Sequence, residues 1–347
     1  MTPEESITII KANLAEVMNP EVIDNVILKE QRPLRIYWGT APTGKPHCGS
    51  FVPMVKIAEL LHAGCHVKIL LADKHAHMDS LTPLESSLKA IGVDVSKLEF
   101  VVGSSFQDSK EYQADRFRFS NNVNVSQLLK AGSEVVKQGG NPTLELGGVD
   151  QRKLSTFAKE NMPKLGYKVR AHLMNAMVPG LGEAQKMSSS EPSSKINLLD
   201  TPEEVAKKLR KAIYVPKQVE GNGIIAVIEH VIFHVEPLKT GGKPRFTAET
   251  REGEVLVYED IFQLKEDYES DTLTPQILKP ALIKALNDLL GPIRKDFDAN
   301  EDSKRVADLA YPAEVKPEEI KKENKNGRRS QKLHFRTSTQ RVKDEVP

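Results

Sequence analysis

The stretch LRIYWGTAPTGKPHCGS, residues 34–50, indicates the class of fold. Residues 34–38 are apolar or aromatic except for Arg35, which predicts a short strand. The glycine and proline residues of 39–49 predict a loop, and apolar residues at helical spacing between Phe51 and Leu61 predict a helix directly after it. A strand, a loop and a helix in this order are typical of a parallel sheet that is covered by helices.

The remainder of the first half continues this alternation. Residues 67–72 are almost uninterruptedly apolar, as expected for a strand that is buried on both faces, and residues 100–102 predict a third short strand. The predicted fold class is therefore α/β, with a Rossmann-like parallel sheet and flanking helices. Ligands of such sheets bind beyond the carboxyl ends of the strands, and the loop 39–49 lies at such an end.

The pattern changes after about residue 195. Residues 239–254 are glycine-rich, charged and predicted to be irregular. Helices are predicted on both sides of them, over residues 202–213, 223–235, 258–267 and 275–290. We therefore expect three parts: an α/β domain over residues 1–195, a mainly helical domain over 196–312 and a disordered basic tail over 313–347.

Composition excludes several classes of protein. Of the 347 residues, 39% are apolar and 28% charged, which permits a packed core and is unlike a disordered chain. The two cysteines, Cys48 and Cys65, are too few for a disulfide framework or a zinc site. No apolar stretch approaches the length of a membrane span, and the acidic Glu4 and Glu5 are unlike an export leader. We expect a cytoplasmic protein of a reducing compartment, with no metal site of its own.

The net charge of +1 conceals an uneven distribution. Between Lys321 and Lys343 nine basic residues accompany a single acidic one, Glu323, so this segment carries +8 and the rest of the chain −7. A basic segment of this kind can hold a polyanion such as RNA by electrostatic attraction. A solvated end of the chain explains the same composition equally well.

The loop after the first strand partly matches a phosphate-binding loop. Gly39, Gly44 and Lys45 have the spacing of the Gly-x4-Gly-Lys motif of nucleotide hydrolases. The next residue of that motif is Ser or Thr, whose hydroxyl binds magnesium. Here it is Pro46, which also lacks a backbone N–H for a phosphate. A phosphate-loop hydrolase is therefore the less favoured alternative.

Two separate segments suit a nucleotide better. His47 and Gly49 lie at the start of the predicted helix, where backbone N–H groups and the helix dipole attract anions. The segment Lys186-Met187-Ser188-Ser189-Ser190 follows a glycine-bearing stretch and can act as a mobile clamp on a pyrophosphate. Taken singly, a structural histidine and a polar surface loop are the plainer explanations, so the hypothesis requires both segments.

Together these segments resemble the HIGH and KMSKS signatures of class I aminoacyl-tRNA synthetases, and more narrowly those of the tyrosyl-tRNA synthetases of the eukaryotic cytoplasm. Further resembling stretches occur in the order of that family: residues 37–44, 71–76, 147–153 and 172–175. The resemblance covers most of residues 8–312. It implies that ATP, accompanied by Mg2+, activates tyrosine as tyrosyl-adenylate and that the tyrosyl group then passes to tRNA(Tyr).

The resemblance also implies roles for individual residues. Catalysis falls to four side chains: His47, Lys186, Ser188 and Ser189. ATP binding falls to a larger set: Gly39, Thr40, Pro42, Thr43, Gly44, His47, Gly49, Gly148, Asp150, Gln151, Lys186, Met187, Ser188, Ser189 and Ser190. Tyrosine binding falls to a third set: Tyr37, Gly39, Ala72, Asp73, His75 and Gln151.

Members of that family are homodimers whose second domain reads the anticodon of tRNA. The candidate tRNA contacts here are five basic residues: Lys207, Lys208, Arg210, Lys211 and Arg251. Basic residues on a helix face are more often simply solvated. Residues 111–137 match the segment through which relatives pair, so a homodimer is the implied state.

The sequence departs from the family at the amino-acid pocket. Relatives carry a helix with Tyr-x3-Gln-x2-Asp shortly before Gly147, and this chain lacks that pattern. Glu145 stands where they have a glutamine, Ser50 stands in place of a tyrosine, and residues 81–88 replace a longer helix. We therefore expect an opened tyrosine pocket, and better binding of ATP or tRNA than activation of tyrosine. A catalytically impaired tRNA-binding or dimer-forming relative is the alternative function.

Overall fold

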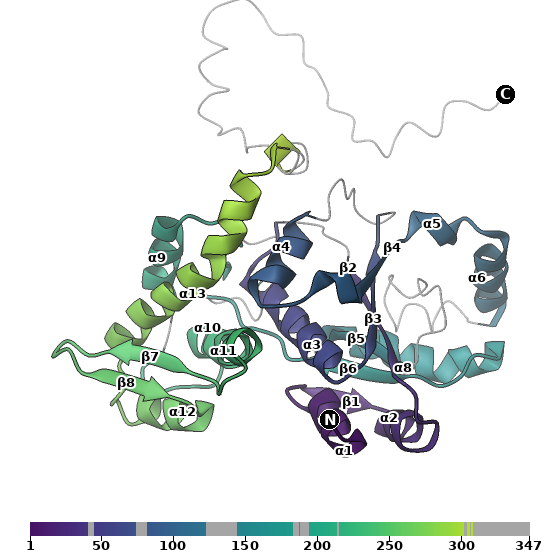
Figure 1. The fold of residues 1–347 in the computed structure, drawn as a ribbon, viewed down its shortest axis with the longest axis horizontal. Helices are drawn as coiled ribbons and strands as arrows, with labels where there is room; N and C mark the ends of the chain where they lie inside the picture. Colours follow the sequence, from purple (N-terminus) through teal and green to yellow (C-terminus); the bar gives the residue numbers. More distant parts are fainter. Residues whose placement is uncertain are drawn as a thin grey trace, which may run out of the picture. The chain divides into compact units, whose positions relative to one another are not determined.

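The computed structural model describes residues 1–40, 45–73, 82–122, 144–182, 187, 194–213, 215–301, 304–305 and 307. Figure 1 shows these residues in colour. Residues Met1–Tyr311 form one compact unit, with a hydrophobic core that extends from Ile10 to Ile293 along the sequence. Within the described ranges, no helix combines the length and apolar character needed to cross a membrane. The tail predicted over residues 313–347 lies outside these ranges.

A six-stranded sheet organises the first half of the chain. Its strands, in spatial order, are β1 (Glu16–Met18), β6 (Ala171–Asn175), β5 (Leu144–Gly148), β2 (Arg35–Thr40), β3 (His66–Leu71) and β4 (Leu98–Val102). The pairs from β6 to β4 are all parallel, which confirms the predicted fold class, and β2, β3 and β4 are the three predicted strands. β1 corrects the expectation of a wholly parallel sheet, because it pairs antiparallel with β6. It precedes the first strand–helix unit, so no crossover connection imposes a parallel direction.

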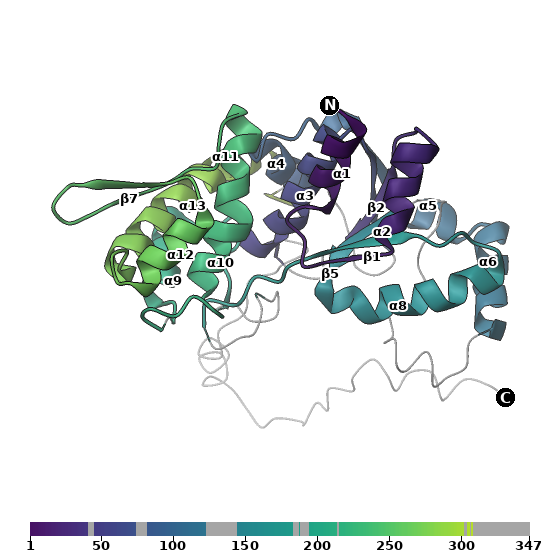
Figure 2. The same ribbon diagram turned by 90° about the horizontal axis from the view of Figure 1, so that it is seen from below.

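Helices cover both faces of this sheet. In the first half they are α1 (Pro3–Lys11), α2 (Pro20–Asp24), α3 (Phe51–His62), α4 (Thr82–Ala90), α5 (Ser104–Gln107), α6 (Lys110–Asn122) and α8 (Arg152–Asn161). Figure 2 shows α1 and α3 on one side of the strands and α8 on the other. α3 is buried along most of its length because it packs against the sheet, α1 and α11. Residues 81–88, where we expect relatives to have a longer helix, lie largely within α4.

The two faces of the sheet differ in chemistry. Ile36 and Trp38 of β2 belong to the main core, on the face that packs against α3. Successive residues of a strand point to opposite faces. Tyr37, Glu145 and His172 are therefore on the other face, where the strand register places them in one row. On that side α6 and α8 share a separate small apolar cluster around the rings of Phe119 and Phe157.

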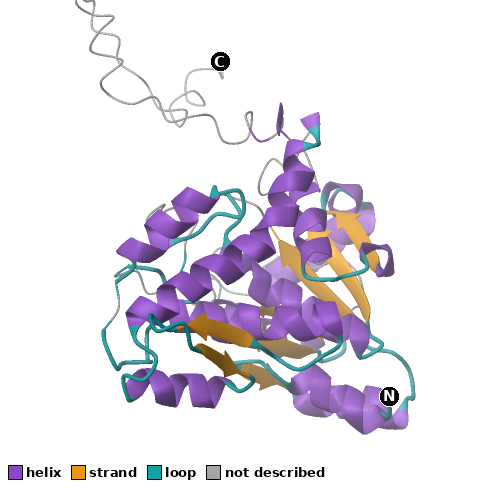
Figure 3. Cartoon of the chain, turned by 60° about the vertical axis from the view of Figure 1, so that its left-hand side comes forward, coloured by secondary structure: helices purple, strands orange, loops and turns teal. Residues whose placement is uncertain are grey.

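The second half is mainly helical, as predicted. Its helices are α9 (Pro202–Lys211), α10 (Gly223–Val227), α11 (Phe233–Thr240), α12 (Ile261–Glu269) and α13 (Pro275–Asp298). Residues 239–254 are not wholly irregular, contrary to the prediction. β7 (Phe246–Glu249) and β8 (Val255–Tyr258) form an antiparallel hairpin, orange in Figure 3. The alternation of buried and exposed residues along β7 is the strand signal, and the glycines and charges around it obscured this signal.

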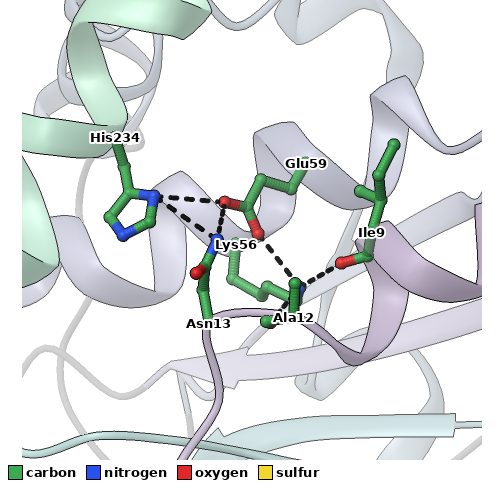
Figure 4. A network of polar contacts seen from close by, with 6 residues as sticks. All are labelled: Ile9, Ala12, Asn13, Lys56, Glu59 and His234. Carbon is green, nitrogen blue, oxygen red and sulfur yellow. Dashed lines mark hydrogen bonds and ion pairs between the residues drawn. The ribbon is translucent and has the colours of Figure 1, made fainter. Parts of the chain in front are cut away.

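A buried ionic network joins α1, α3 and α11 (Figure 4). The ammonium group of Lys56, a residue only 1% exposed, donates to three acceptors: Ile9 O at 2.7 Å, Ala12 O at 2.8 Å and Glu59 Oε2 at 3.0 Å. Glu59 also accepts from Asn13 Nδ2 at 2.9 Å and pairs with His234 Nδ1 of α11 at 3.4 Å. The network therefore ties the end of α1 and the helix α11 to α3, which starts at the predicted nucleotide segment.

Candidate active site

The carboxyl ends of the parallel strands meet at one edge of the sheet, where ligands of α/β sheets bind. Thr40 ends β2, Gly148 ends β5 and Asn175 ends β6, with Gly148 directly opposite Asn175 in the register. Asp73 lies just beyond the end of β3. The structure thus brings predicted ATP and tyrosine residues from several parts of the chain to the same edge.

His47 is held near this edge by a short backbone pairing. Residues 46–48 run antiparallel to residues 196–198, and the N–H of Cys48 donates to the carbonyl oxygen of Ile196 at 2.9 Å. His47 then occupies the N-cap position of the short 3-10 helix Cys48–Ser50, which leads directly into α3. The pairing therefore fixes the backbone on which the predicted nucleotide segment is built.

Met187 reaches the same place from the second predicted segment. Its N–H donates to the carbonyl oxygen of Val178 at 3.0 Å, and its side chain is buried. A Cβ placed on Gly49 would lie 3.8 Å from the Cβ of Met187 and 3.0 Å from the ring of His47. The two segments therefore lie close together, and a Cβ on Gly49 would crowd the ring of His47 rather than Met187. Seven other predicted residues of the nucleotide site lie outside the described part of the chain: Pro42, Thr43, Gly44, Lys186, Ser188, Ser189 and Ser190.

The electrostatic surroundings of His47 favour an anionic ligand. Burial, and next the ammonium group of Lys195, lower the pKa of His47 from its ordinary 6.5 to about 4. The imidazole is therefore neutral at pH 7, and its Nδ1 has no hydrogen-bond partner in the described part of the chain. Burial and the charges of Lys208 and Lys45 in turn lower the pKa of Lys195. Several cations near a neutral imidazole suit a polyphosphate.

Asp150 and Gln151 fold back over the end of β5. Both belong to the short 3-10 helix Val149–Gln151. A Cβ on Gly148 would lie 2.5 Å from Asp150 Oδ1, and one on Gly147 would lie 3.6 Å from the Cβ of Gln151. Because successive strand residues face opposite sides, Asp150 lies over the face that packs on α3 and Gln151 over the face of Tyr37. The two glycines leave room for both side chains.

Tyr37 lies on the other face of the sheet, and its side chain extends toward the same edge. Its hydroxyl oxygen is 2.6 Å from the position that a Cβ of Gly39 would take, so the ring runs over Gly39. Its register partner Glu145 has Oε2 2.9 Å from His172 Nδ1. Burial, followed by the charge of Glu145, raises the pKa of Tyr37 above its ordinary value. The hydroxyl therefore stays protonated and can donate a hydrogen bond.

The residues after β3 are at the edge as well. The N–H of Ala72 donates to the carbonyl oxygen of Thr40 at 3.0 Å, which extends the pairing of β2 with β3. Asp73 Oδ1 accepts from the N–H of Ser104 at 2.8 Å, at the start of α5. Asp73 thus joins β3 to α5 while it borders the candidate site. The predicted tyrosine contact His75 lies outside the described residues.

The comparisons with known proteins agree with this geometry. The family model described as tRNA synthetases class I (W and Y) matches residues 29–146 and 138–291. The chain belongs to this family. Two relatives are cytoplasmic tyrosine–tRNA ligases: that of Saccharomyces cerevisiae is 40% identical over 98% of this chain and 96% of its own length, and that of Xenopus tropicalis is 42% identical over 93% and 66%. Among solved structures, the tyrosyl-tRNA synthetase of Archaeoglobus fulgidus complexed with L-tyrosine is 30% identical, with a TM-score of 0.73 over 85% of this chain and 99% of that chain.

The match of this synthetase to its relatives is interrupted. The alignment with the Saccharomyces cerevisiae relative extends over 378 positions, more than the 347 residues of the chain, so that relative has residues with no counterpart here. The family match divides into two ranges that overlap at residues 138–146. This break falls just before Gly147, where the sequence lacks the Tyr-x3-Gln-x2-Asp pattern. A substitute for this pattern would have to lie within residues 123–143, and these residues are outside the described ranges.

The predicted tRNA contacts of the synthetase do not form one group. Lys207, Arg210 and Lys211 are exposed on α9, and Arg251 is exposed in the turn between β7 and β8. Lys208 instead pairs with the largely buried Asp200 at 2.5 Å. Its ammonium group is therefore paired with a carboxylate. It points toward the backbone of residues 196–198 rather than toward open solvent.

Two buried polar residues at this edge received no predicted role. Lys195 and Asn175 are each 3% exposed. Lys195 reaches His47 because residues 196–198 pair with residues 46–48, and Asn175 lies in the site because of its register with Gly148. No local spacing in the sequence encodes either relationship. The two residues could have been found only by knowing which segment pairs with residues 196–198 and which strand pairs with β6.

Proposed function

We propose that this chain is a tyrosine–tRNA ligase, which activates tyrosine with ATP and transfers it to tRNA(Tyr). The observation that carries the proposal is the proximity of Gly49 to Met187, since these residues belong to the two candidate nucleotide segments. Relatives named tyrosine–tRNA ligase align with nearly the whole chain. The related structure in complex with L-tyrosine supports tyrosine as the amino acid.

The nucleotide would lie on the α3 face of the sheet. In the first step the tyrosine carboxylate attacks the α-phosphorus of ATP, the bond to the bridging oxygen breaks, and pyrophosphate leaves with its negative charge. The protein needs no nucleophile of its own and contributes alignment and charge stabilisation. The neutral His47 donates to a phosphate oxygen, Lys195 adds positive charge, and Lys186 with the hydroxyls of residues 188–190 holds the pyrophosphate. Mg2+, which would accompany ATP, would offset part of the negative charge of the phosphates.

Tyrosine would lie on the opposite face, beside Tyr37. The ring of Tyr37 runs over Gly39 and the side chain of Gln151 lies near Gly147, so the substrate ring would lie beside these two side chains. The protonated Tyr37 hydroxyl donates to the substrate phenol, and Gln151 and Asp73 border the space. A site that hydrogen-bonds a buried hydroxyl rejects phenylalanine, because polar groups would be left unpaired.

The remaining parts would serve tRNA and assembly. We assign the catalytic domain to residues 1–195, anticodon binding to residues 196–312, and additional RNA affinity to the basic residues 313–347. The exposed cations Lys207, Arg210, Lys211 and Arg251 are the candidate phosphate contacts. Phe117 of α6, 69% exposed, lies in the segment 111–137 through which we expect a homodimer to form. The cytoplasm, named for the relatives, is the expected compartment.

Charging of tRNA(Tyr) with labelled tyrosine tests this proposal. The full chain should charge tRNA(Tyr) in an ATP-dependent reaction, with tyrosine preferred to tryptophan and phenylalanine. Equal charging with tryptophan would contradict the assignment of tyrosine. Tight tRNA binding without any charging would instead favour the catalytically impaired RNA-binding relative.

A further inference from the structure

We propose that Asn175 recognises the adenine base of ATP. The inference rests on the proposed function, because it takes ATP to be the ligand of this edge. Asn175 is the last residue of β6 and is 3% exposed. Neither its Oδ1 nor its Nδ2 has a hydrogen-bond partner in the part of the chain that the structure describes. Buried polar groups are nearly always paired, so a buried amide with both atoms unsatisfied indicates a ligand that completes it.

The position of Asn175 places it in the nucleotide half of the site. Strand alternation puts Asn175 on the same face as Leu173, which belongs to the core that packs on α3. Gly148 is its direct register partner, and the register of β2 with β5, continued to the strand ends, brings Thr40 opposite Gly148. Thr40, Gly148 and Asn175 therefore form a row across three neighbouring strands. A Cβ on the central glycine would lie 2.5 Å from Asp150 Oδ1, so the carboxylate of Asp150 lies over the middle of the row.

The surroundings of this row suit a nucleoside. The sulfur of Met177 would lie 3.5 Å from a Cβ on Gly148, so an apolar surface borders the space above the glycine. Val178, three residues after Asn175, holds the backbone of Met187, which in turn contacts Gly49. The cation Lys195 lies near His47, whereas Asn175 ends β6 beside Gly148. We place the phosphates at His47 and the base beside Asn175.

The chemistry of the carboxamide selects among bases. An asparagine side chain offers one acceptor and one donor side by side. Adenine presents the complementary pair along one edge, since its amino group donates to Oδ1 and a ring nitrogen accepts from Nδ2. The N7 and O6 edge of guanine presents two acceptors, which the amide cannot satisfy together. Asn175 therefore suits adenine better than it suits the N7 and O6 edge of guanine.

Calorimetric titration of ATP and GTP into the full chain tests the inference. We expect Asn175→Leu and Asn175→Asp each to lose on the order of 10-fold to 100-fold in ATP affinity. Asn175→Asp should also shift its preference toward GTP, because two acceptor oxygens match the N1–H and amino group of guanine. A purely structural role would not produce this change of preference. Tyrosine affinity, measured in the same preparations, should stay within about twofold of the unmodified chain, since Asn175 faces away from Tyr37.

Asn161→Leu is the matched control. Asn161 is as deeply buried, but its Nδ2 donates to Phe157 O at 2.9 Å within its own helix, so its loss should leave ATP affinity unchanged. Unchanged ATP affinity in both Asn175 variants, beside an unmodified chain that binds ATP, overturns the inference and leaves the proposed function intact. Equal losses for ATP and GTP in Asn175→Asp also overturn it. An unmodified chain that binds no ATP contradicts the proposed function, and the inference with it.

Discussion

Gly49 and Met187 are 138 residues apart in the sequence, yet a Cβ on Gly49 would lie 3.8 Å from the Cβ of Met187. This contact joins the segment that starts α3 to the segment that carries Lys186 and its neighbouring serines. A Cβ on Gly49 would make an ordinary contact with Met187, but it would lie only 3.0 Å from the ring of His47. A side chain at position 49 would therefore crowd His47.

Gly49→Ala should weaken ATP binding. The added methyl group has to displace the His47 ring by a few tenths of an ångström, which misaligns a group that we place on the phosphates. We expect the KM for ATP to rise about 10-fold with little change in Tm, as measured by exchange kinetics and circular dichroism. Gly291→Ala in α13, where an added Cβ meets nothing within 4 Å, should behave as the unmodified chain. Equal effects of the two substitutions would contradict a special role of Gly49.

The buried network of α3 should lose stability when either charge is removed alone. Burial by itself would raise the pKa of Glu59, but hydrogen bonds from His234, Lys56 and Asn13 together hold it below its ordinary value. Glu59→Leu leaves the Lys56 ammonium buried without a counter-charge, at a cost of about 3 kcal/mol in the free energy of unfolding. Lys56→Met should cost a similar amount, and the double variant much less than the sum of both. Urea unfolding of the four proteins measures this coupling, and additive losses would refute it.

His47 should make stability depend on pH below neutrality. Its pKa in the folded chain, about 4, is below the ordinary 6.5, so between these values the unfolded chain takes up the proton more readily. The stability contributed by the neutral imidazole is therefore fully present above pH 6.5 and is lost as the pH falls toward 4. Urea unfolding at pH 7.5, 6.5, 5.5 and 4.5 should show the unmodified chain losing stability faster than His47→Asn. A constant difference between the two proteins across this range would disagree with the burial of His47.

Removal of the basic residues 313–347 should flatten the salt dependence of tRNA binding. Each phosphate neutralised by a lysine or arginine releases counterions, so fewer basic residues give a smaller slope of log K against log salt. Fluorescence anisotropy with labelled tRNA, at salt concentrations from about 50 to about 200 mM, compares the full chain with the shortened chain. ATP affinity should not change. Identical slopes would show that the basic segment does not contact RNA.

The elements that the sequence predicts best are those with a continuous local signal. β2, β3 and β4 have runs that are mostly apolar or aromatic, and the helices of the second half have a clear period. β5 contains Gly147 and Gly148, and β1 is only three residues long, so neither has a signal that stands above its surroundings. The hairpin of β7 and β8 was missed for a related reason. Two four-residue strands are stabilised mainly by each other rather than by local preference.

The residues of the candidate site also differ in how far the sequence predicts them. His47 and Gly49 stand in a contiguous motif at a strand–helix junction, and a motif of this kind is visible in sequence. Lys195 and Asn175 enter the site through strand register and a backbone pairing between distant segments. Such relationships arise only when the sheet forms. The inward pairing of Lys208 with Asp200 likewise required the structure, because a basic residue on a helix gives no sign of which partner it will meet.

Tyrosine-dependent exchange of labelled pyrophosphate into ATP, catalysed by the purified full chain, tests the account most directly. We expect exchange that requires tyrosine, is not supported by phenylalanine or tryptophan, and is slower than that of the Saccharomyces cerevisiae relative because the Tyr-x3-Gln-x2-Asp pattern is missing before Gly147. A rate equal to that of the relative would contradict the opened pocket. Exchange no faster with tyrosine than without any amino acid would contradict the central claim that this chain activates tyrosine.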